Sequence, residues 1–378
     1  MARHIYVHNP FCARKCPYCD FYSVTDRSCT EAFYKAAIRE VELIASVIGE
    51  NTGTNPLTDI DNRDTVYFGG GTPSFLGTDI LAEIISHIHT AENCEMTVEC
   101  NPSDACGNNP DFSFETLAAA GVNRISMGLQ SAVDNERKAL GRRAGKNEVE
   151  NAVRKCIESG IDNISLDLML GVPGQTSETL DESIEFCAST GARHISAYIL
   201  KIEEGTYFYK NAGKLNLPDE EATAEMYLRT VEKLSTYGFN QYEISNFTHK
   251  GYESRHNLKY WHCEEYLGIG PSAHSFIDGK RMFYPRDIEY FLSGGAPEYD
   301  CDGGDPEEYI MLALRLTEGL DLVKLKERYG IKPDSRFYDY TDILSEKGLA
   351  VFENNRLKLT PNGFLVSNSV ICEIIDRI

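Results

Sequence analysis

The stretch that decides the fold runs from residue 4 to residue 19 and reads HIYVHNPFCARKCPYC. Its first part is a short apolar run of the kind that forms a buried strand. Its second part is a loop that carries Cys12, Cys16 and Cys19. A loop that follows a strand of a parallel sheet lies at the carboxyl edge of the sheet, where α/β proteins build their sites. The stretch therefore predicts an α/β fold with three thiolates at that edge.

The alternation of strand and helix continues from this stretch to about residue 245. Further apolar runs predict strands at 65–69, 96–100, 124–129, 163–170, 194–200 and 240–245. Amphipathic segments between them predict helices at 30–48, 78–91, 113–120, 147–159, 177–190 and 219–237. Repeated βα units of this kind surround a parallel sheet. We expect a partial (β/α)6 barrel, and a doubly wound open sheet is the alternative that periodicity does not exclude.

The alternation stops after about residue 250. A stretch rich in glycine and aromatic residues, YLGIGPSAHSF, precedes an acidic loop at about 293–308 that we interpret as a linker. Three helical patterns (307–317, 321–329 and 335–347) and a short hairpin around Asn354 and Asn355 then predict a winged-helix-like domain. The expected division is a core at 1–245, an extension with linker at 246–300, and a C-terminal domain at 301–378.

Composition narrows the classes of partner and compartment. The formal charge of −21 argues against a broad phosphate-backbone footprint, so nucleic acid is not an expected partner. No stretch approaches the roughly 18 apolar residues of a membrane helix, and the N-terminus has no secretory signal. Nine of the twelve cysteines are scattered, which indicates reduced thiols rather than a disulfide framework. We expect a cytoplasmic protein.

The three clustered cysteines can hold a metal group. Iron-sulfur cubes are normally closed by four thiolates, so three ligands would leave one iron open to a substrate or cofactor. A zinc site is the alternative, and His8 would then be needed because zinc requires a fourth Cys or His ligand. Three inert thiols are the remaining interpretation.

Polar residues lie at the ends of the other expected strands. The run GGGTP at 69–73 follows the second strand, and its glycines let backbone amides approach a bound polar group. Glu99 ends the third strand, Gln130 follows the fourth, and Asp167 lies within the fifth. Strand ends of a parallel sheet converge on one mouth. Each residue taken singly is equally consistent with an ordinary hydrogen-bonded strand end.

The Cys-x3-Cys-x2-Cys motif after a first strand resembles that of the radical S-adenosylmethionine (SAM) superfamily. Within it, HNPFCARKCPYCDFYS resembles the oxygen-independent coproporphyrinogen III oxidase branch, and the likeness extends through most of the chain. The resemblance implies a 4Fe-4S cluster on Cys12, Cys16 and Cys19. It also implies that Tyr6, Gly70 and Glu99 contact a first SAM. The positions that the resemblance assigns to a second SAM are Gly71, Thr72, Gln130, Arg142, Asp167 and Lys201.

Two departures count against the decarboxylation of coproporphyrinogen. The oxidases resemble Cys-x3-Cys-x2-Cys-x-Cys, whereas this chain has Phe21 at the last position. The motif also begins twelve residues into the sequence, whereas the oxidases carry a longer N-terminal extension over the site. We therefore expect that the chain is less suited to this reaction than the oxidases are.

A further stretch, RHNLKYW at 255–261, contains the only tryptophan of the chain. It resembles the H-N-x-x-Y-W motif of HemW-type haem chaperones. A histidine can bind haem iron and flanking aromatic rings can stack on a macrocycle, so His256 is a candidate haem ligand. The other interpretation from the residues is a packed aromatic turn with a hydrogen-bonded histidine.

Three functions follow from these observations. The preferred one is a haem chaperone with a SAM-ligated cluster that passes haem to acceptor proteins, respiratory proteins among them. The alternative is an oxidase that decarboxylates porphyrinogen propionates through a SAM-derived radical. A DNA-binding regulator acting through the winged-helix-like domain is disfavoured by the acidic charge.

Overall fold

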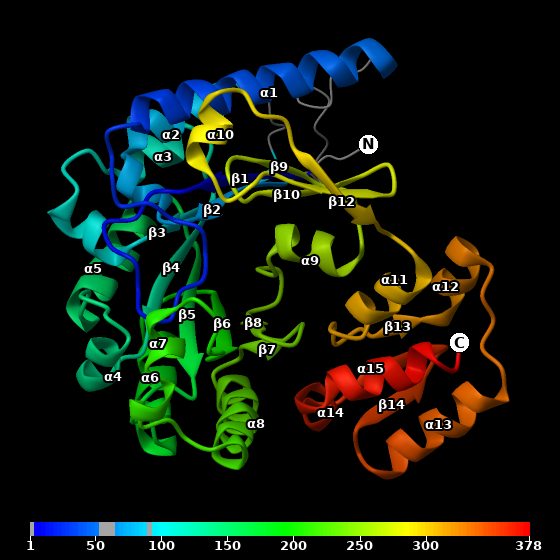
Figure 1. Cartoon of the computed structure of the whole chain (residues 1–378). Helices are drawn as coiled ribbons and strands as arrows, with labels where there is room; N and C mark the ends of the chain where they lie inside the picture. Colours follow the sequence, from blue (N-terminus) through cyan, green and yellow to red (C-terminus); the bar gives the residue numbers. More distant parts are fainter. Residues whose placement is uncertain (1–3, 53–64, 89–92) are drawn as a thin grey trace.

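The computed structural model describes residues 4–52, 65–88 and 93–378 (Figure 1). In these residues the main sheet has nine strands in the order β7-β8-β6-β5-β4-β3-β2-β1-β9. Six of them are parallel and adjacent in chain order, namely β1 (His4–Asn9), β2 (Thr65–Gly70), β3 (Glu95–Cys100), β4 (Arg124–Gln130), β5 (Asn163–Leu170) and β6 (His194–Ile199). A doubly wound sheet would reverse this order. The expected partial (β/α)6 barrel is therefore confirmed and the doubly wound alternative is wrong.

Helices cover the outer face of this sheet (Figure 1). They begin where capping residues satisfy the free amides of the first turn; Thr176, for example, accepts a hydrogen bond from the amide of Thr179. Their apolar residues recur at helical spacing and are buried, as at Val149, Val153 and Cys156. The main ones are α1 (Thr30–Thr52), α2 (Thr78–Ser86), α3 (Phe114–Ala119), α5 (Lys146–Glu158), α6 (Ser177–Ser189) and α8 (Glu220–Thr236).

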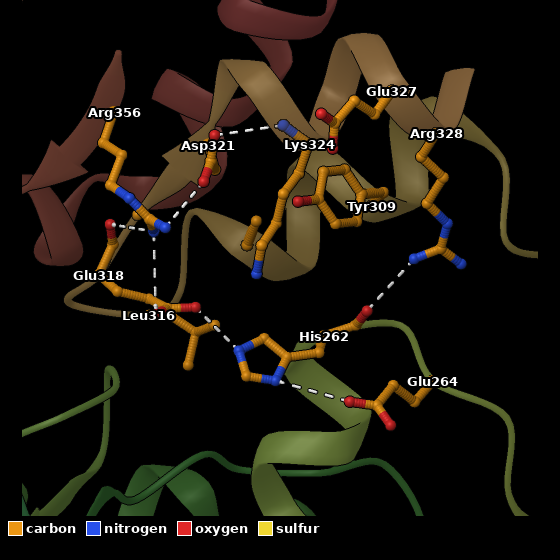
Figure 2. Close-up of a pocket in the computed structure, with 12 residues that line it drawn as sticks. His262, Glu264, Tyr309, Leu316, Glu318, Asp321, Lys324, Glu327, Arg328 and Arg356 are labelled. Carbon is orange, nitrogen blue, oxygen red and sulfur yellow. Dashed lines mark hydrogen bonds and ion pairs between the residues drawn. The ribbon is translucent and has the colours of Figure 1, made fainter. Parts of the chain in front are cut away.

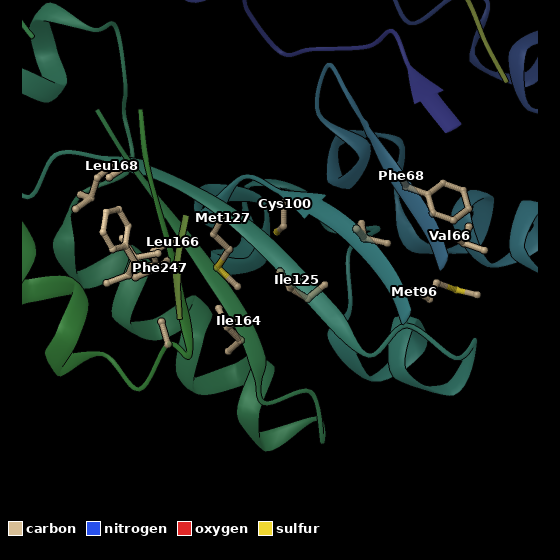
Figure 3. Packing of buried hydrophobic residues seen from close by; sticks show 14 of the residues in the cluster. Val66, Phe68, Met96, Cys100, Ile125, Met127, Ile164, Leu166, Leu168 and Phe247 are labelled. Carbon is tan, nitrogen blue, oxygen red and sulfur yellow. The ribbon is translucent and has the colours of Figure 1, made fainter. Parts of the chain in front are cut away.

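The strands divide their side chains between two faces because successive residues point in opposite directions. One set packs under the helices as the core, which includes Val66, Phe68, Ile125 and Leu166 at 0–1% exposure (Figure 3). The residues between them point to the inner face of the barrel. Tyr67, Glu99 and Asp167 belong to this second set, since their neighbours in sequence belong to the core. The core residues thus orient the polar ones inward.

The expected strand at 240–245 is wrong in its extent. β7 (Asn240–Gln241) pairs with β8 (Asn246–Thr248), which runs antiparallel to β6. The residues between them leave the sheet and bond to the C-terminal part of the chain: the Ile244 amide donates to Arg315 O (2.9 Å) and the Thr317 amide donates to Tyr242 O (3.1 Å). A long-range pairing of this kind leaves no local sequence signal.

Next come α9 (Arg255–Trp261) and β9 (Leu267–Ile269), which adds parallel to β1 at the edge of the main sheet. A small antiparallel sheet follows, formed by β10 (His274–Ile277), β11 (Lys280–Phe283) and β12 (Glu298–Asp302), with α10 (Ile288–Leu292) before β12. The expected linker at 293–308 is therefore partly wrong. β12 is exposed along its length, so it gains backbone hydrogen bonds without the apolar pattern that would have revealed it.

The C-terminal part contains the predicted helices and hairpin. The helices are α11 (Pro306–Ala313), α12 (Leu322–Tyr329) and α13 (Ser335–Glu346). β14 (Ala350–Glu353) and β15 (Arg356–Leu359) form the hairpin, whose turn residues Asn354 and Asn355 have φ values of 52° and 60°. β13 (Leu320–Asp321) completes a small sheet, and the unpredicted helices α14 (Pro361–Leu365) and α15 (Ser367–Ile375) pack beside it. In the described part of the chain no helix has the length and hydropathy that a bilayer crossing requires.

Candidate functional site

The three cysteines lie in residues 10–24, which we call the cluster loop. The backbone closes this loop: the Cys12 amide donates to Val24 O (3.0 Å), and the Val24 amide donates to Pro10 O (2.7 Å). All three thiols are partly exposed at the carboxyl edge of the sheet, which we call the mouth. Burial raises the pKa of Cys12 and Cys19. A positive group such as cluster iron is therefore needed to hold them as thiolates.

The arrangement of the thiols and of His8 argues against the alternative of a zinc site. Among the described residues no three His, Cys, Asp or Glu side chains converge as they would around one metal ion. The ring of His8 is also engaged, since its Nδ1 lies 3.2 Å from the Tyr6 hydroxyl and its Nε2 lies 3.0 Å from Tyr22 O. The donor set of three thiols at a common mouth suits a larger iron-sulfur group better than a single zinc ion.

The glycine run after β2 lies against the start of the cluster loop. Gly70 has a φ of +102°, and a Cβ at this position would lie 2.5 Å from the ring of His8. A Cβ on Gly71 would lie 2.6 Å from Phe11 O. The amides of Gly71 and Thr72 donate to Asn9 O (2.6 Å) and Phe11 O (2.8 Å), and the hydroxyl of Thr72 lies 3.3 Å from Cys12 Sγ. The glycines therefore join the run to the cluster loop as well as exposing backbone.

Glu99 is a carboxylate on the inner face beside this run. The Tyr67 hydroxyl donates a 2.9 Å hydrogen bond to Glu99 Oε1. Burial, and then the charge of Asp167, raise the pKa of Glu99 to about 7. Among the described residues no cationic side chain forms an ion pair with it. An ammonium group bound here would compensate the buried charge, which is the property that the amino group of SAM requires.

Asp167 faces the same space from β5. Burial raises its pKa to about 6, whereas Ser196, Arg124 and Arg142 act in the opposite direction. The hydroxyl of Ser126 on β4 donates to Asp167 Oδ1 at 3.4 Å. Two carboxylates, from β3 and β5, thus share a polar interior with cations around it.

Gln130 ends β4 in an unusual backbone conformation. Its φ is 70°, in the left-handed region, and the register of β4 against β5 shifts between Gly128 and Gln130. Left-handed residues other than glycine cost free energy and persist only when their surroundings hold them. The bulge turns the end of the strand at the mouth.

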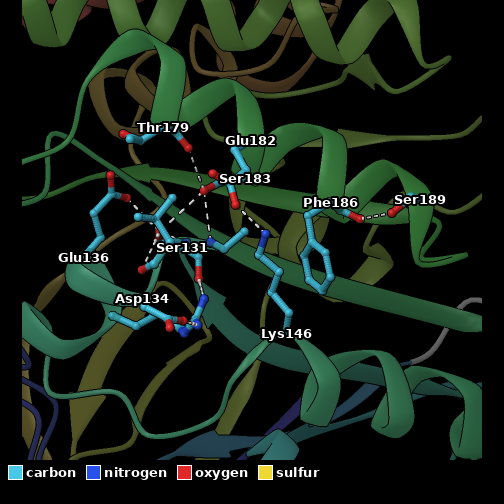
Figure 4. Close-up of polar contacts among 12 residues, drawn as sticks. Ser131, Asp134, Glu136, Lys146, Thr179, Glu182, Ser183, Phe186 and Ser189 are labelled. Atoms are coloured by element: carbon cyan, nitrogen blue, oxygen red, sulfur yellow. Dashed lines mark hydrogen bonds and ion pairs between the residues drawn. The ribbon is translucent and has the colours of Figure 1, made fainter.

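A buried network holds the loop after Gln130 (Figure 4). The Ser131 hydroxyl donates to Glu136 Oε2 (2.7 Å), and the Ala132 amide donates to the Ser183 hydroxyl on α6 (3.0 Å). Arg137 Nη1 donates to Ser131 O (3.0 Å). No sequence pattern predicts the role of these residues, because they support a site residue without following any strand.

Arg142 connects β4 to the cluster loop. Its Nη2 donates to Gly128 O (2.6 Å), and its Nη1 donates to Cys16 Sγ at 3.9 Å. Lys201, by contrast, lies outside this group: its side chain is 80% exposed and pairs with Glu203 at 2.8 Å. The structure therefore does not bring Lys201 together with the other expected contacts of a second SAM.

Tyr6 and Tyr67 lie between the mouth and the opposite end of the barrel. Their ring centroids are 6.1 Å apart, and the ring of His256 stacks on Tyr67 at 5.1 Å. Burial raises the pKa of both hydroxyls well above the ordinary range, so they remain neutral donors. Tyr67 was not among the predicted site residues, although its place in the strand, one residue before Phe68 and two before Gly69, predicts an inward side chain.

His256 lies at the amino edge of the sheet, not at the mouth. Its Nδ1 lies 2.7 Å from the hydroxyl of Thr65, the first residue of β2, and its amide donates to Glu95, the first residue of β3. Its Nε2 lies 2.7 Å from the hydroxyl of Tyr260. The ring is buried and its pKa is lowered to about 3, chiefly by that burial.

Both nitrogens of His256 are thus occupied, and the structure does not offer either to haem iron. The structure contains the hydrogen-bonded aromatic turn that the residues also allowed, and the assignment of His256 as an axial ligand stays a prediction. The motif closes the amino end of the barrel by tying α9 to β2 and β3, a location that in α/β barrels serves stability.

A separate charged pocket lies between the residues after α9 and the C-terminal helices (Figure 2). His262 Nε2 bonds to Glu318 (2.8 Å), and Arg356 bonds to Asp321 (2.7 Å). Several of its charged groups are therefore engaged in ion pairs. This composition does not suit a flat apolar macrocycle, so we assign the pocket to the contact between the two parts of the chain.

Comparison with known proteins agrees with this geometry. Residues 6–187 match the model of the Radical SAM superfamily, and residues 305–366 match that of the HemN C-terminal domain. The solved coproporphyrinogen III oxidase (HemN) of Escherichia coli, described as a radical SAM enzyme, superposes with a TM-score of 0.78 at 18% identity, over 98% of this chain and 89% of that one. At this identity the likeness establishes the fold.

Relatives identified by sequence similarity indicate the family more specifically than the fold does. The chain is 36% identical over 380 residues to the heme chaperone HemW of Bacillus subtilis (strain 168), with 97% of each chain covered. It is 32% identical over 386 residues to the heme chaperone HemW of Mycobacterium tuberculosis (strain ATCC 25618 / H37Rv), with 97% of this chain and 93% of the relative covered. The mitochondrial radical S-adenosyl methionine domain-containing protein 1 of Bos taurus is 35% identical over 399 residues, with 99% and 87% covered. The chain therefore belongs to the radical SAM superfamily and, within it, to the family of the heme chaperone HemW.

Proposed function

We propose that this chain is a haem chaperone, which takes up haem beside a SAM-ligated 4Fe-4S cluster and passes the haem to acceptor proteins. The observation that carries the proposal is the 36% identity to a heme chaperone HemW over 97% of both chains. Because the similarity covers the core, the extension and the C-terminal part together, the whole arrangement has a counterpart in that relative.

The residue roles are part of the proposal. The thiolates of Cys12, Cys16 and Cys19 hold three irons of the cluster, and the fourth iron accepts SAM. When bound, the cluster supplies the electron chemistry typical of the superfamily. Glu99, kept in place by the Tyr67 hydroxyl, accepts the ammonium group of SAM.

Other residues organise the same space. Tyr6 and Gly70 complete the contacts of the first SAM. The Arg142 guanidinium, which reaches Cys16 Sγ and Gly128 O, fixes the cluster loop relative to β4. The candidate contacts of a second SAM that face the mouth are Gly71, Thr72, Gln130, Arg142 and Asp167.

Several features of the sequence stay predictions within this proposal. They are the division of the chain at residues 245 and 300, a cytoplasmic location, the absence of a nucleic-acid partner, and acceptors that include respiratory proteins. Phe21 occupies the position of the additional cysteine of the oxidases and is 67% exposed, so nothing in its place supplies a thiol. We therefore expect no decarboxylation of coproporphyrinogen.

The test is a pair of anaerobic assays on the full chain after reconstitution with iron and sulfide. In one assay haem is titrated into the protein and its Soret absorption is followed. In the other, SAM and coproporphyrinogen III are added and carbon dioxide is measured. We expect stoichiometric haem uptake and no carbon dioxide. Carbon dioxide release that depends on SAM would replace the chaperone function with the oxidase function. A protein that takes up no haem would contradict the chaperone function.

A further inference from the structure

We propose that His274 is the side chain that binds haem iron, at the rim of the mouth beside the cluster loop. The inference rests on the haem-chaperone function proposed above and names the residue that would hold the cargo. Its basis is the position of β10, the free state of the His274 ring, and the contacts that join this region to the cluster loop.

The position of His274 follows from the topology. β9 runs parallel to β1, with Ile269 opposite Val7, so both strands end at the mouth. The chain then turns at Gly270, where a Cβ would lie 2.5 Å from His8 O. His274 begins β10 directly after this turn. The turn thus places the histidine next to the end of β1, from which the cluster loop departs.

The ring of His274 is free. Each of the other histidines in the described part of the chain has a ring nitrogen in a hydrogen bond or ion pair, namely His4, His8, His87, His194, His249, His256 and His262. The His274 side chain has no such partner among the described residues and is exposed. Desolvation of the ring lowers the pKa of His274, which favours the neutral imidazole, the form whose lone pair can bind a metal.

The surroundings of His274 suit a flat macrocycle with acidic side chains. The ring of Phe283 stacks against His274 with centroids 5.8 Å apart. Arg286 follows on the same segment, and the Ser272 amide donates to Pro285 O (3.2 Å), which keeps this segment beside the turn before His274. The Arg286 guanidinium donates to Asp20, and its remaining N–H groups can donate to a haem propionate.

Contacts join this segment to the cluster loop. Arg286 Nη2 donates to Asp20 Oδ2 (3.0 Å), and the Ile288 amide donates to the Tyr22 hydroxyl (2.9 Å). Between these two contact points the cluster loop carries Phe21, whose ring is 67% exposed. A large exposed apolar ring between anchored neighbours is a contact that a porphyrin face can use. Haem bound to His274 would therefore lie next to the cluster.

The experiment compares haem binding by full-length, cluster-loaded protein and its variants. Haemin is titrated into wild type, His274→Ala and the control His249→Ala, whose ring instead bonds to Gly238 O. We expect His274→Ala to weaken haem binding by roughly tenfold or more and to change the Soret and low-spin iron spectra, while His249→Ala matches wild type. Added imidazole should restore the spectrum of His274→Ala. His274→Cys should give the spectrum of a thiolate ligand, which a merely structural role would not produce.

The outcomes separate the inference from the function. If wild type does not take up haem, the proposed function fails and this inference fails with it. If wild type binds haem and His274→Ala does so with unchanged affinity and spectrum, the inference is wrong and the function stands. If His274→Ala loses the cluster absorption, its haem binding no longer tests the ligand, and the spectrum of His274→Cys is used instead. A His274→Cys protein that binds haem without a thiolate spectrum overturns the assignment.

Discussion

The ring of His256 stacks on the ring of Tyr67, with centroids 5.1 Å apart and an interplanar angle of 28°. The hydroxyl of the same tyrosine donates to Glu99 at 2.9 Å. A residue at the amino edge of the barrel is thereby connected to a carboxylate near the mouth through one intervening ring. This relationship gives the HNLKYW motif a role that does not require contact with haem.

The first prediction concerns His256→Ala. The change leaves the Tyr260 hydroxyl without its ring partner and removes a buried side chain, so we expect a loss of about 3 kcal/mol in unfolding free energy. SAM affinity should fall because Tyr67 loses its support, and a haem spectrum should persist. Thermal unfolding and SAM calorimetry measure both effects, with His249→Ala, whose ring is only partly buried, as the control. A SAM affinity equal to that of wild type would refute the connection.

The second prediction concerns the cluster ligands. Replacement of Cys12, Cys16 or Cys19 by Ala should abolish the visible absorption of the reconstituted cluster, since each thiolate holds one iron. Cys301→Ala is the matched control because Cys301 is exposed and lies on β12. Iron and sulfide analysis should give close to four irons per chain in wild type and control. Stoichiometric zinc in place of iron would contradict the cluster.

The third prediction is a pH dependence of SAM binding. The pKa of Glu99 is about 7 in the folded protein, above its ordinary value of 4.5. The carboxylate that attracts an ammonium group therefore forms as pH rises through 7, and SAM affinity should increase from about pH 6 to about pH 8. Glu99→Gln should bind SAM weakly and lose this pH dependence. An identical pH profile in wild type and variant would exclude Glu99 as the titrating group.

The same shift predicts how stability without SAM changes with pH. Between pH 4.5 and about 7 the folded protein keeps the Glu99 proton that the unfolded chain has released, so folded Glu99 binds more protons. This residue therefore contributes a fall in stability as pH rises through that window. Glu99→Gln should remove the contribution and be more stable than wild type above pH 7. Denaturant unfolding at several pH values measures it, and a variant with the same slope as wild type would contradict the raised pKa.

The fourth prediction separates backbone strain from packing at the glycine run. Gly70 and Gly121 have φ values of +102° and +98°, but only at Gly70 would a Cβ meet another side chain, the His8 ring at 2.5 Å. Gly121→Ala should cost about 1–2 kcal/mol through strain alone. Gly70→Ala should cost more and reduce cluster loading, because His8 bonds to Tyr22 O in the cluster loop. Equal losses in the two variants, with the cluster intact, would refute the packing role.

Local sequence patterns were sufficient to predict most strands and helices of the barrel. The apolar runs predicted β1 to β6 because buried strands need such residues whatever their neighbours are, and amphipathic spacing predicted the helices over them. The positions of Glu99, Gln130 and Asp167 in their strands were also sufficient to predict that the three side chains lie near one another in the barrel. Features formed by long-range backbone pairing were not predicted. β12 is exposed along its length, and Tyr242 bonds to residue 317 rather than to a neighbouring strand.

The sequence by itself determined the family, the barrel and the three thiols of the cluster loop, because residue type and spacing carry that chemistry directly. Only the tertiary structure decided the places of the histidines. His256 and His274 belong to similar stretches rich in aromatic residues, yet one ring has both nitrogens in hydrogen bonds at the amino edge and the other is free beside the mouth. Whether a histidine can bind a metal depends on which groups from distant segments reach its two nitrogens, and no local pattern specifies them.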